Sequence, residues 1–333
     1  MWTPHACTAV LALAGFSLPW SAPQAAWSDP SPHRVEFVTV AKGVRLEVLD
    51  WGGSGQPIVL LSGLGNTAHV FDDFATAVMS IEAPAGAYHV YAITRRGYGD
   101  SSAPVSGYTA SHLADDVLAV LDSLKIVSPV LVGHSIAGEE MSALAARHPD
   151  RVAGLVYLDA AYDRTDKSLQ AMTKKVTQPT PGAADLASVQ ALRDWMTRAL
   201  GVTVPEAEIR HSVEAAPDGH VVRFRTPPWV AQAIMAGVQK PNYARIRAPA
   251  LAIYAVPRSA HDVPGYADSE ASRAAFEELY QLMVRQQAAD TKRFEGRVAH
   301  GRVLNLSGAH HYVFLSNEAD VLRELRAFIA SLG

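Results

Sequence analysis

The chain has 333 residues, of which 49% are hydrophobic and 19% charged, and its formal net charge at pH 7 is -4. A chain of this length can bury a large core, and one α/β domain with an insertion fits it as well as two domains do. Acidic and basic residues are interspersed, so the sequence offers no basic stripe for a nucleic acid and no polybasic patch for a membrane surface, and phosphate-rich partners are disfavoured.

The N-terminal segment 1–27 resembles a secretory signal peptide. Its apolar stretch from Ala6 to Leu18 is too short to span a bilayer, and small residues and prolines follow it. Because no lysine or arginine precedes this stretch, a disordered N-terminus on a cytoplasmic protein is the alternative hypothesis. Cys7 is the only cysteine and lies inside the segment, so the mature chain would have no thiol. We therefore expect a periplasmic or secreted protein.

The first half of the chain alternates short apolar runs with amphipathic segments. After an opening hairpin, the strands have uninterrupted apolar runs that suit burial on both faces, and the segments between them have helical patterns. This order predicts an α/β fold with a doubly wound, mostly parallel sheet, whose functional groups lie at the carboxyl ends of the strands. In chain order we expect strands at 35–40, 45–51, 57–62, 89–93, 129–132 and 152–158, and helices at 71–79, 113–124 and 139–148.

The alternation of strands and helices stops between residues 162 and 244. Three helical patterns separated by prolines predict a helical cap that is inserted into the sheet domain. The cap helices are expected at 170–175, 186–200 and 230–238. The core, residues 34–161 and 245–333, resumes with predicted strands at 249–255 and 302–306 and helices at 269–289 and 317–332.

The pentapeptide Gly133-His134-Ser135-Ile136-Ala137 has the features of a nucleophile elbow. An apolar strand leads into it, and a segment of helical composition follows. So tight a turn pushes the serine outward and leaves room only for small residues two positions to either side. The hydroxyl then lies at a helix N-terminus, which favours developing negative charge. Taken alone, the motif fits a serine that merely caps the helix equally well.

Four segments, in this order, resemble the signatures of the α/β-hydrolase superfamily. They are Ser62-Gly63-Leu64, the run from Arg96 to Ser101, the elbow, and Gly308-Ala309-His310-His311 before the last helix. The resemblance covers most of the chain outside the leader and the cap. It implies a serine hydrolase with no cofactor and no metal, whose partner is a small-molecule acyl substrate.

A serine hydroxyl needs a base with a pKa near 7, and histidine is the usual one. His310 and His311 follow the last predicted strand, which puts both on the same edge of the sheet as Ser135. The resemblance selects His311, because its spacing to the last helix matches the histidine turn of the family.

The acid of the triad is where the sequence departs from the family pattern. In most members the acid follows the strand equivalent to 251–255, but here Arg258 occupies that position, and a guanidinium cannot accept a hydrogen bond from an imidazole. Asp262 could serve if the loop is four residues longer. Asp159, at the end of an earlier strand, matches an alternative acid site of some dehalogenase-like and lipase-like members. We favour Asp159, because a strand end needs no unusual loop.

The resemblance also implies an oxyanion hole formed by the backbone N–H groups of Leu64 and Ile136. Together these groups predict the cleavage of a carboxylic ester, or a related acyl bond, of a small, apolar substrate through an acyl-enzyme. The alternatives are a cofactor-free haloperoxidase, a perhydrolase or a carbon–carbon bond hydrolase on the same triad, and a non-catalytic ligand-binding protein on this fold. Large cap side chains would either line an apolar pocket or form the core of the cap: Trp195, Met196, Trp229, Met235 and Tyr243.

Overall fold

The computed structural model describes residues 27–81, 86–173, 180–263, 266 and 270–332. It divides into an N-terminal unit that ends at Pro30 and a main unit that begins at Ser31. The described part of the first unit, residues 27–30, has no helix or strand, and the rest of the predicted signal peptide lies outside the described residues. Within the described residues, no helix is both long enough and apolar enough to cross a membrane.

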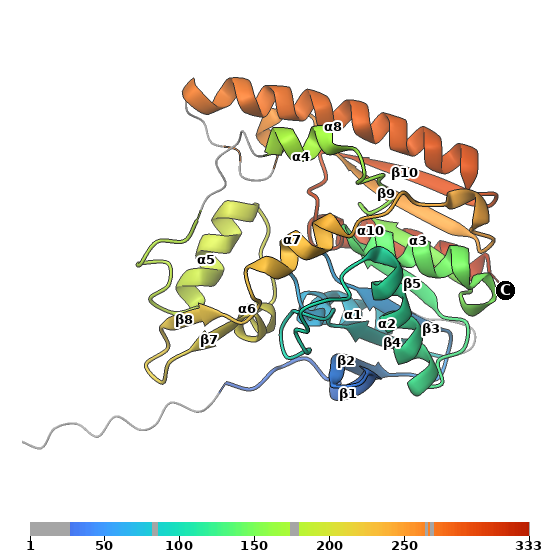
Figure 1. The fold of residues 1–333 in the computed structure, drawn as a ribbon, viewed down its shortest axis with the longest axis horizontal. Helices are drawn as coiled ribbons and strands as arrows, with labels where there is room; N and C mark the ends of the chain where they lie inside the picture. The colour runs from blue at the N-terminus through green and yellow to red at the C-terminus, as the bar shows by residue number, and fades with distance from the viewer. Residues whose placement is uncertain (1–26, 82–85, 174–179, 264–265, 267–269, 333) are drawn as a thin grey trace, which may run out of the picture. The chain divides into compact units, whose positions relative to one another are not determined.

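The main unit is organised around an eight-stranded sheet with the order β1-β2-β4-β3-β5-β6-β9-β10. Strand β2 runs antiparallel to both of its neighbours, and the remaining pairs are parallel, so the sheet is mostly parallel, as the sequence predicts. Figure 1 shows it flanked by helices. Its strands are β1 (Arg34–Ala41), β2 (Val44–Gly52), β3 (Pro57–Leu61), β4 (His89–Ile93), β5 (Val130–His134), β6 (Gly154–Leu158), β9 (Ala250–Val256) and β10 (Gly301–Ser307).

Both faces of the sheet are covered, which explains the uninterrupted apolar runs. Successive side chains of a strand point to opposite faces. Leu60 packs in the cluster that contains Phe74 of α1, whereas its neighbour Val59 packs in the cluster that contains Met141 of α3 and Phe294 of α8. Each fully buried side chain of this size stabilises the fold by about 1.5–3 kcal/mol relative to exposure. The helices of the core are α1 (Asp72–Met79), α2 (Ala110–Ser123), α3 (Ala137–Arg147), α8 (Glu270–Arg297), α9 (Val313–Ser316) and α10 (Glu318–Ala330).

The segment between β6 and β9 contains more than helices. Its elements are α4 (Lys167–Thr173), α5 (Val189–Leu200), α6 (Glu206–Ser212), β7 (Val213–Ala215), β8 (Val221–Phe224) and α7 (Trp229–Ala236). The sequence did not predict α6 or the antiparallel hairpin β7-β8, because these elements have only three to seven residues and so lack a measurable periodicity. The end of the predicted helix 170–175 lies outside the described residues.

Helix α8 is longer than predicted and lies beside α4 (Figure 1). It continues to Arg297 rather than ending near Ala289. Its last turns are fixed by Phe294, which is fully buried and meets Tyr157 and Tyr243 edge to face, at ring-centroid distances of 5.4 and 5.3 Å. Tertiary packing therefore extends the helix beyond its clear apolar pattern.

Candidate active site

Ser135 lies between the end of β5 and the start of α3, at the carboxyl edge of the sheet. Its φ is +54°, a left-handed conformation that costs a non-glycine residue free energy and is typical of functional turns. A Cβ on Gly133 would lie 2.1 Å from Sδ of Met141, so any larger residue at that position of the turn would require the buried Met141 side chain to move. The geometry is that of the predicted elbow.

The structure brings together the three side chains proposed as a triad. Nε2 of His311 is 2.9 Å from Oγ of Ser135, and Nδ1 of His311 is 2.6 Å from Oδ2 of Asp159. Asp262, the alternative acid, instead accepts hydrogen bonds from the backbone N and from Nε of Arg258, at 2.8 and 3.1 Å. The residue that displaces the usual acid thus holds the alternative acid in a local ion pair.

Asp159 is held on both carboxylate oxygens. While Oδ2 faces His311, Oδ1 accepts hydrogen bonds from the hydroxyl of Tyr162 at 2.5 Å and from the backbone N of Ala255 at 3.0 Å. Burial, and then the Asp159 charge, raise the pKa of Tyr162 well above its usual value, so the phenol remains a donor. Asp159 also has a left-handed φ, +48°. Tyr162 cannot be identified from the sequence, since its three-residue separation from Asp159 carries no recognised motif.

Two further histidines lie close to His311 in the chain or in space. Buried His134 donates from Nε2 to the carbonyl oxygen of His311 at 3.0 Å, which holds the backbone of His311. Burial lowers the pKa of His134, and burial likewise lowers the pKa of His310 to about 4. Both rings are therefore neutral at pH 7, and the ring of His310 stacks on that of Tyr312.

The loop that contains Leu64 lies against the nucleophile. A Cβ on Gly63 would be 3.4 Å from Cβ of Ser135, and the side chains of Leu64 and Ile136 pack in one hydrophobic cluster. Arg95 holds the start of this loop by donating to the carbonyl oxygens of Ser62 and Gly63 at 2.7 and 3.3 Å. The two segments with the proposed oxyanion donors therefore meet at Ser135.

A cavity of about 400 Å³ is lined by the three proposed triad residues. Leu279 and Met283 of α8 contribute to its apolar wall, and Arg164 and Gln286 add polar groups. Of the five cap side chains considered from the sequence, Met235 lines it. The other four lie elsewhere: Tyr243 is buried in the core under one face of the sheet, Trp195 and Met196 pack against the opposite core, and Trp229 is 38% exposed.

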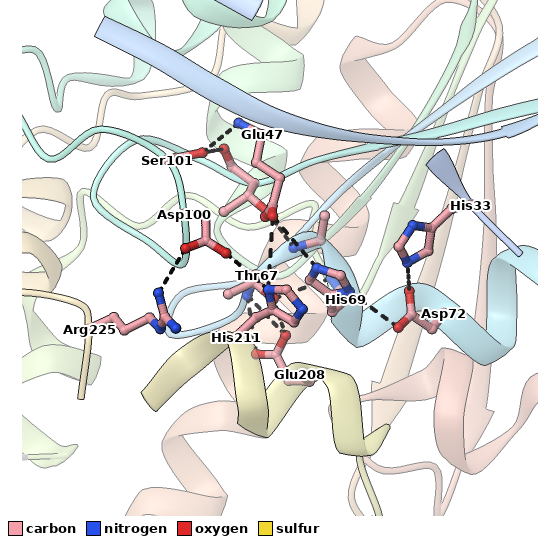
Figure 2. Close-up of polar contacts among 12 residues, drawn as sticks. His33, Glu47, Thr67, His69, Asp72, Asp100, Ser101, Glu208, His211 and Arg225 are labelled. Atoms are coloured by element: carbon pink, nitrogen blue, oxygen red, sulfur yellow. Dashed lines mark hydrogen bonds and ion pairs between the residues drawn. The ribbon is translucent and has the colours of Figure 1, made fainter. Parts of the chain in front are cut away.

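A second polar group, outside the cavity, has the chemistry of metal ligands. Ligand atoms of Glu47, His69 and His211 lie within 4.8 Å of one another (Figure 2). However, the rings of His69 and His211 stack, with centroids 3.6 Å apart and planes 16° apart. An imidazole lone pair lies in the plane of its ring, so two stacked rings cannot direct their lone pairs at one ion. In this conformation the three residues do not form a metal centre.

Comparison with known proteins gives the fold and the family. Residues 56–245, more than half of the chain, match the family model described as alpha/beta hydrolase fold. The 2-(acetamidomethylene)succinate hydrolase of Mesorhizobium japonicum is 27% identical over 159 residues, which are 48% of this chain and 53% of that protein. The bifunctional esterase/perhydrolase of Acinetobacter calcoaceticus is 34% identical over 125 residues (37% and 44%), and a non-heme haloperoxidase of Rhodococcus erythropolis is 35% identical over 125 residues (37% and 43%). The chain thus spans about half the length of the curated relatives it matches.

Solved structures resemble the chain over most of its length. An E-2-(acetamidomethylene)succinate hydrolase superposes with a TM-score of 0.66 at 21% identity, covering 90% of this chain and 99% of the other. An esterase from Exiguobacterium antarcticum superposes with a TM-score of 0.58 at 18% identity, covering 88% and 98%. At these identities the similarity shows a shared fold.

Proposed function

The chain belongs to the alpha/beta hydrolase fold family, and from that premise we propose that it is a serine hydrolase that cleaves a carboxylic ester of a small, apolar substrate. The observation that carries the proposal is the hydrogen-bonded line from Asp159 through His311 to Ser135 at the edge of an apolar cavity. The curated relatives named as hydrolases and esterases support it.

The proposed reaction follows from the positions of the donors and acceptors. Nε2 of His311 takes the proton of Ser135 as Oγ attacks the acyl carbon, and Asp159 stabilises the imidazolium that forms. The N–H groups of Leu64 and Ile136 stabilise the oxyanion, and losing one such donor typically costs about 10²–10³-fold in kcat. His311 then protonates the leaving alcohol. In the second half-reaction it activates the water that releases the acid.

Peracid formation is the second candidate activity. The same acyl-enzyme yields a peracid if hydrogen peroxide attacks the acyl carbon in place of water, with Ser135 regenerated in both cases. The esterase/perhydrolase relative favours this candidate. Comparing ester hydrolysis with peracid production from short carboxylic acids and hydrogen peroxide separates the two activities.

A fluorophosphonate probe tests the proposal directly. We expect it to label the full chain at a single serine and Ser135→Ala to abolish both labelling and the hydrolysis of p-nitrophenyl butyrate. A folded wild-type chain that is neither labelled nor active would contradict the proposal and favour a non-catalytic binding protein.

We also propose that the chain is exported, because segment 1–27 has the composition of a signal peptide. The test is cell fractionation of the full chain with a C-terminal tag. Export requires a tagged product in the periplasm or the medium that is shortened near residue 27.

A further inference from the structure

Glu208 is a buried carboxylate on α6 that contacts the loop following Leu64. It is 1% exposed, and it accepts hydrogen bonds from Nδ2 of Asn66 at 3.0 Å, from the backbone N of Thr67 at 3.1 Å and from the hydroxyl of Thr67. Figure 2 shows Glu208 pointing from its helix toward Thr67. One side chain of the segment inserted between β6 and β9 thus binds two consecutive residues of the core.

The hydrogen bonds that Glu208 accepts come from neutral groups. The donors to Glu208 in the described part of the chain are neutral amide, backbone and hydroxyl groups, and burial raises its pKa to about 7. Glu206, on the same helix, is paired with Arg210 at the surface, with 2.7 Å between Nε and Oε1. A carboxylate buried without a bonded cation is costly, and the raised pKa indicates that the hydrogen bonds from the loop offset only part of that cost.

The loop formed by residues 62–67 contains no helix or strand, so its position depends on side-chain contacts at its two ends. Arg95 holds its first two carbonyl oxygens, and Arg95 is itself paired with buried Glu140, with Nη2 to Oε1 at 2.8 Å. Glu208 holds its last two residues. Leu64, with its proposed oxyanion donor, lies between these two anchors.

Asn66 extends the contact toward the base. Its Nδ2 donates to Glu208, and its Oδ1 accepts from the hydroxyl of Tyr312 at 3.0 Å. Tyr312 follows His311 directly in the chain. The side chain of Asn66 therefore links the inserted segment, the loop of Leu64 and the turn of the base.

Helix α6 is itself fixed to the core one turn after Glu208. Nδ1 of His211 lies 3.1 Å from Oδ2 of Asp100, whose Oδ1 accepts from Arg225 at 2.8 Å (Figure 2). The ring of His211 stacks on His69, two residues beyond Thr67. These contacts keep Glu208 facing the loop.

We infer that Glu208 is a positioning residue of the oxyanion hole, through which the inserted segment holds the N–H of Leu64 where it meets the oxyanion. The inference rests on the proposed function for its catalytic consequence, although the anchoring itself does not. Displacing a donor by less than 1 Å weakens its hydrogen bond to the transition state. It weakens substrate binding less, because substrate binding depends on the cavity walls.

The test compares Glu208→Gln and Glu208→Ala with Glu206→Gln, a matched control on the same helix. The readouts on the full chain are kcat and KM for p-nitrophenyl butyrate, inhibition by phenylboronic acid, thermal unfolding and amide hydrogen exchange of segment 62–70. Phenylboronic acid forms a tetrahedral adduct with the serine and so mimics the transition state.

We expect Glu208→Gln to lower kcat about tenfold or more and to weaken the binding of phenylboronic acid by a similar factor. KM should change less than threefold, and amide hydrogen exchange in segment 62–70 should become faster. Glu208→Ala should be more severe. If it fails to fold, Glu208→Gln decides the outcome. Glu206→Gln should match the wild type in every readout.

Two results would overturn the inference. One is an unchanged rate of amide hydrogen exchange in segment 62–70 of Glu208→Gln. This result would show that Glu208 does not anchor the loop, whether or not the chain has esterase activity. The other is faster exchange with kcat and phenylboronic acid affinity within twofold of the wild type. Failure of the proposed function is distinguished by an inactive and unlabelled wild type, in which case the exchange experiment still tests the anchor.

Discussion

The phenol of Tyr162 lies 2.5 Å from Oδ1 of Asp159, on the carboxylate whose other oxygen faces His311. The acid of the proposed triad is therefore oriented by a side chain from the segment that immediately follows it. A backbone N–H from the neighbouring strand β9 completes the set of donors.

Tyr162→Phe should lower kcat about tenfold or more, because Asp159 loses one of the donors that fix Oδ1 and a hydrogen bond to a charged group contributes about 1.5–3 kcal/mol. The measurement is kcat for p-nitrophenyl butyrate. Tyr254→Phe is the matched control, since its hydroxyl donates to the carbonyl oxygen of Ala161 at 2.8 Å. Equal losses in the two variants would mean that the effect is general packing.

Asp159→Asn should lower kcat by about 10³–10⁴-fold, because an amide cannot stabilise the imidazolium that forms on His311. Asp262→Asn should stay within a few-fold of the wild type, since its contacts are with Arg258. Parallel kinetics of the two purified variants decide between the acids. A large loss in Asp262→Asn alone would reject the assignment of Asp159.

Glu139 makes the stability of the fold depend on pH. Burial raises its pKa to about 7, and Oε1 is buried with no hydrogen-bond partner among the described residues. Between the unfolded pKa near 4.5 and the folded pKa near 7, only the folded chain keeps this proton, so the stabilisation present at low pH is lost as the pH rises through 7.

Glu139→Gln should therefore gain stability relative to the wild type between pH 5 and pH 8, by at most about 3 kcal/mol. Urea unfolding at several pH values measures this difference. Glu295→Gln, at an exposed position of α8, is the control and should show no such trend. A constant difference between Glu139→Gln and the wild type across this range would contradict the prediction.

Gly133→Ala should destabilise the fold by about 1–3 kcal/mol, because the new methyl group overlaps Met141 in a closely packed core. Gly296→Ala is the opposite case, since a Cβ there meets nothing within 4 Å and alanine is the better helix former. Chemical denaturation of both variants checks the contrast. A Gly133→Ala chain as stable as the wild type would show that the elbow has more room than its geometry indicates.

The strands and the elbow could be predicted from the sequence because their information is local. A buried parallel strand is a short apolar run, and the tight turn at Ser135 needs small neighbours. Tyr162 and Glu208 could not be identified in this way. Glu208 meets Thr67 across 141 residues, and its burial is set by tertiary packing that no periodicity reports.

The residues that form the apolar wall of the cavity could not be predicted from the sequence either. The sequence offered the large side chains of the inserted segment, but Leu279 and Met283 come from α8, which reads as an ordinary sheet-covering helix. The tertiary fold decides which face of a long helix lines a cavity. Because α8 has low amphipathicity, its sequence does not indicate which of its faces does so.

The position of Asp159 at the end of β6 has an evolutionary consequence. Because the proposed acid lies at the same edge of the sheet as Ser135, the proposed mechanism requires no proton transfer by the turn after β9. Pro257, Asp262 and Val263 of that turn nevertheless line the cavity. If the proposed triad is correct, selection can alter substrate preference there by insertion or substitution while the triad stays intact, which makes this turn the natural place to begin directed evolution of substrate preference.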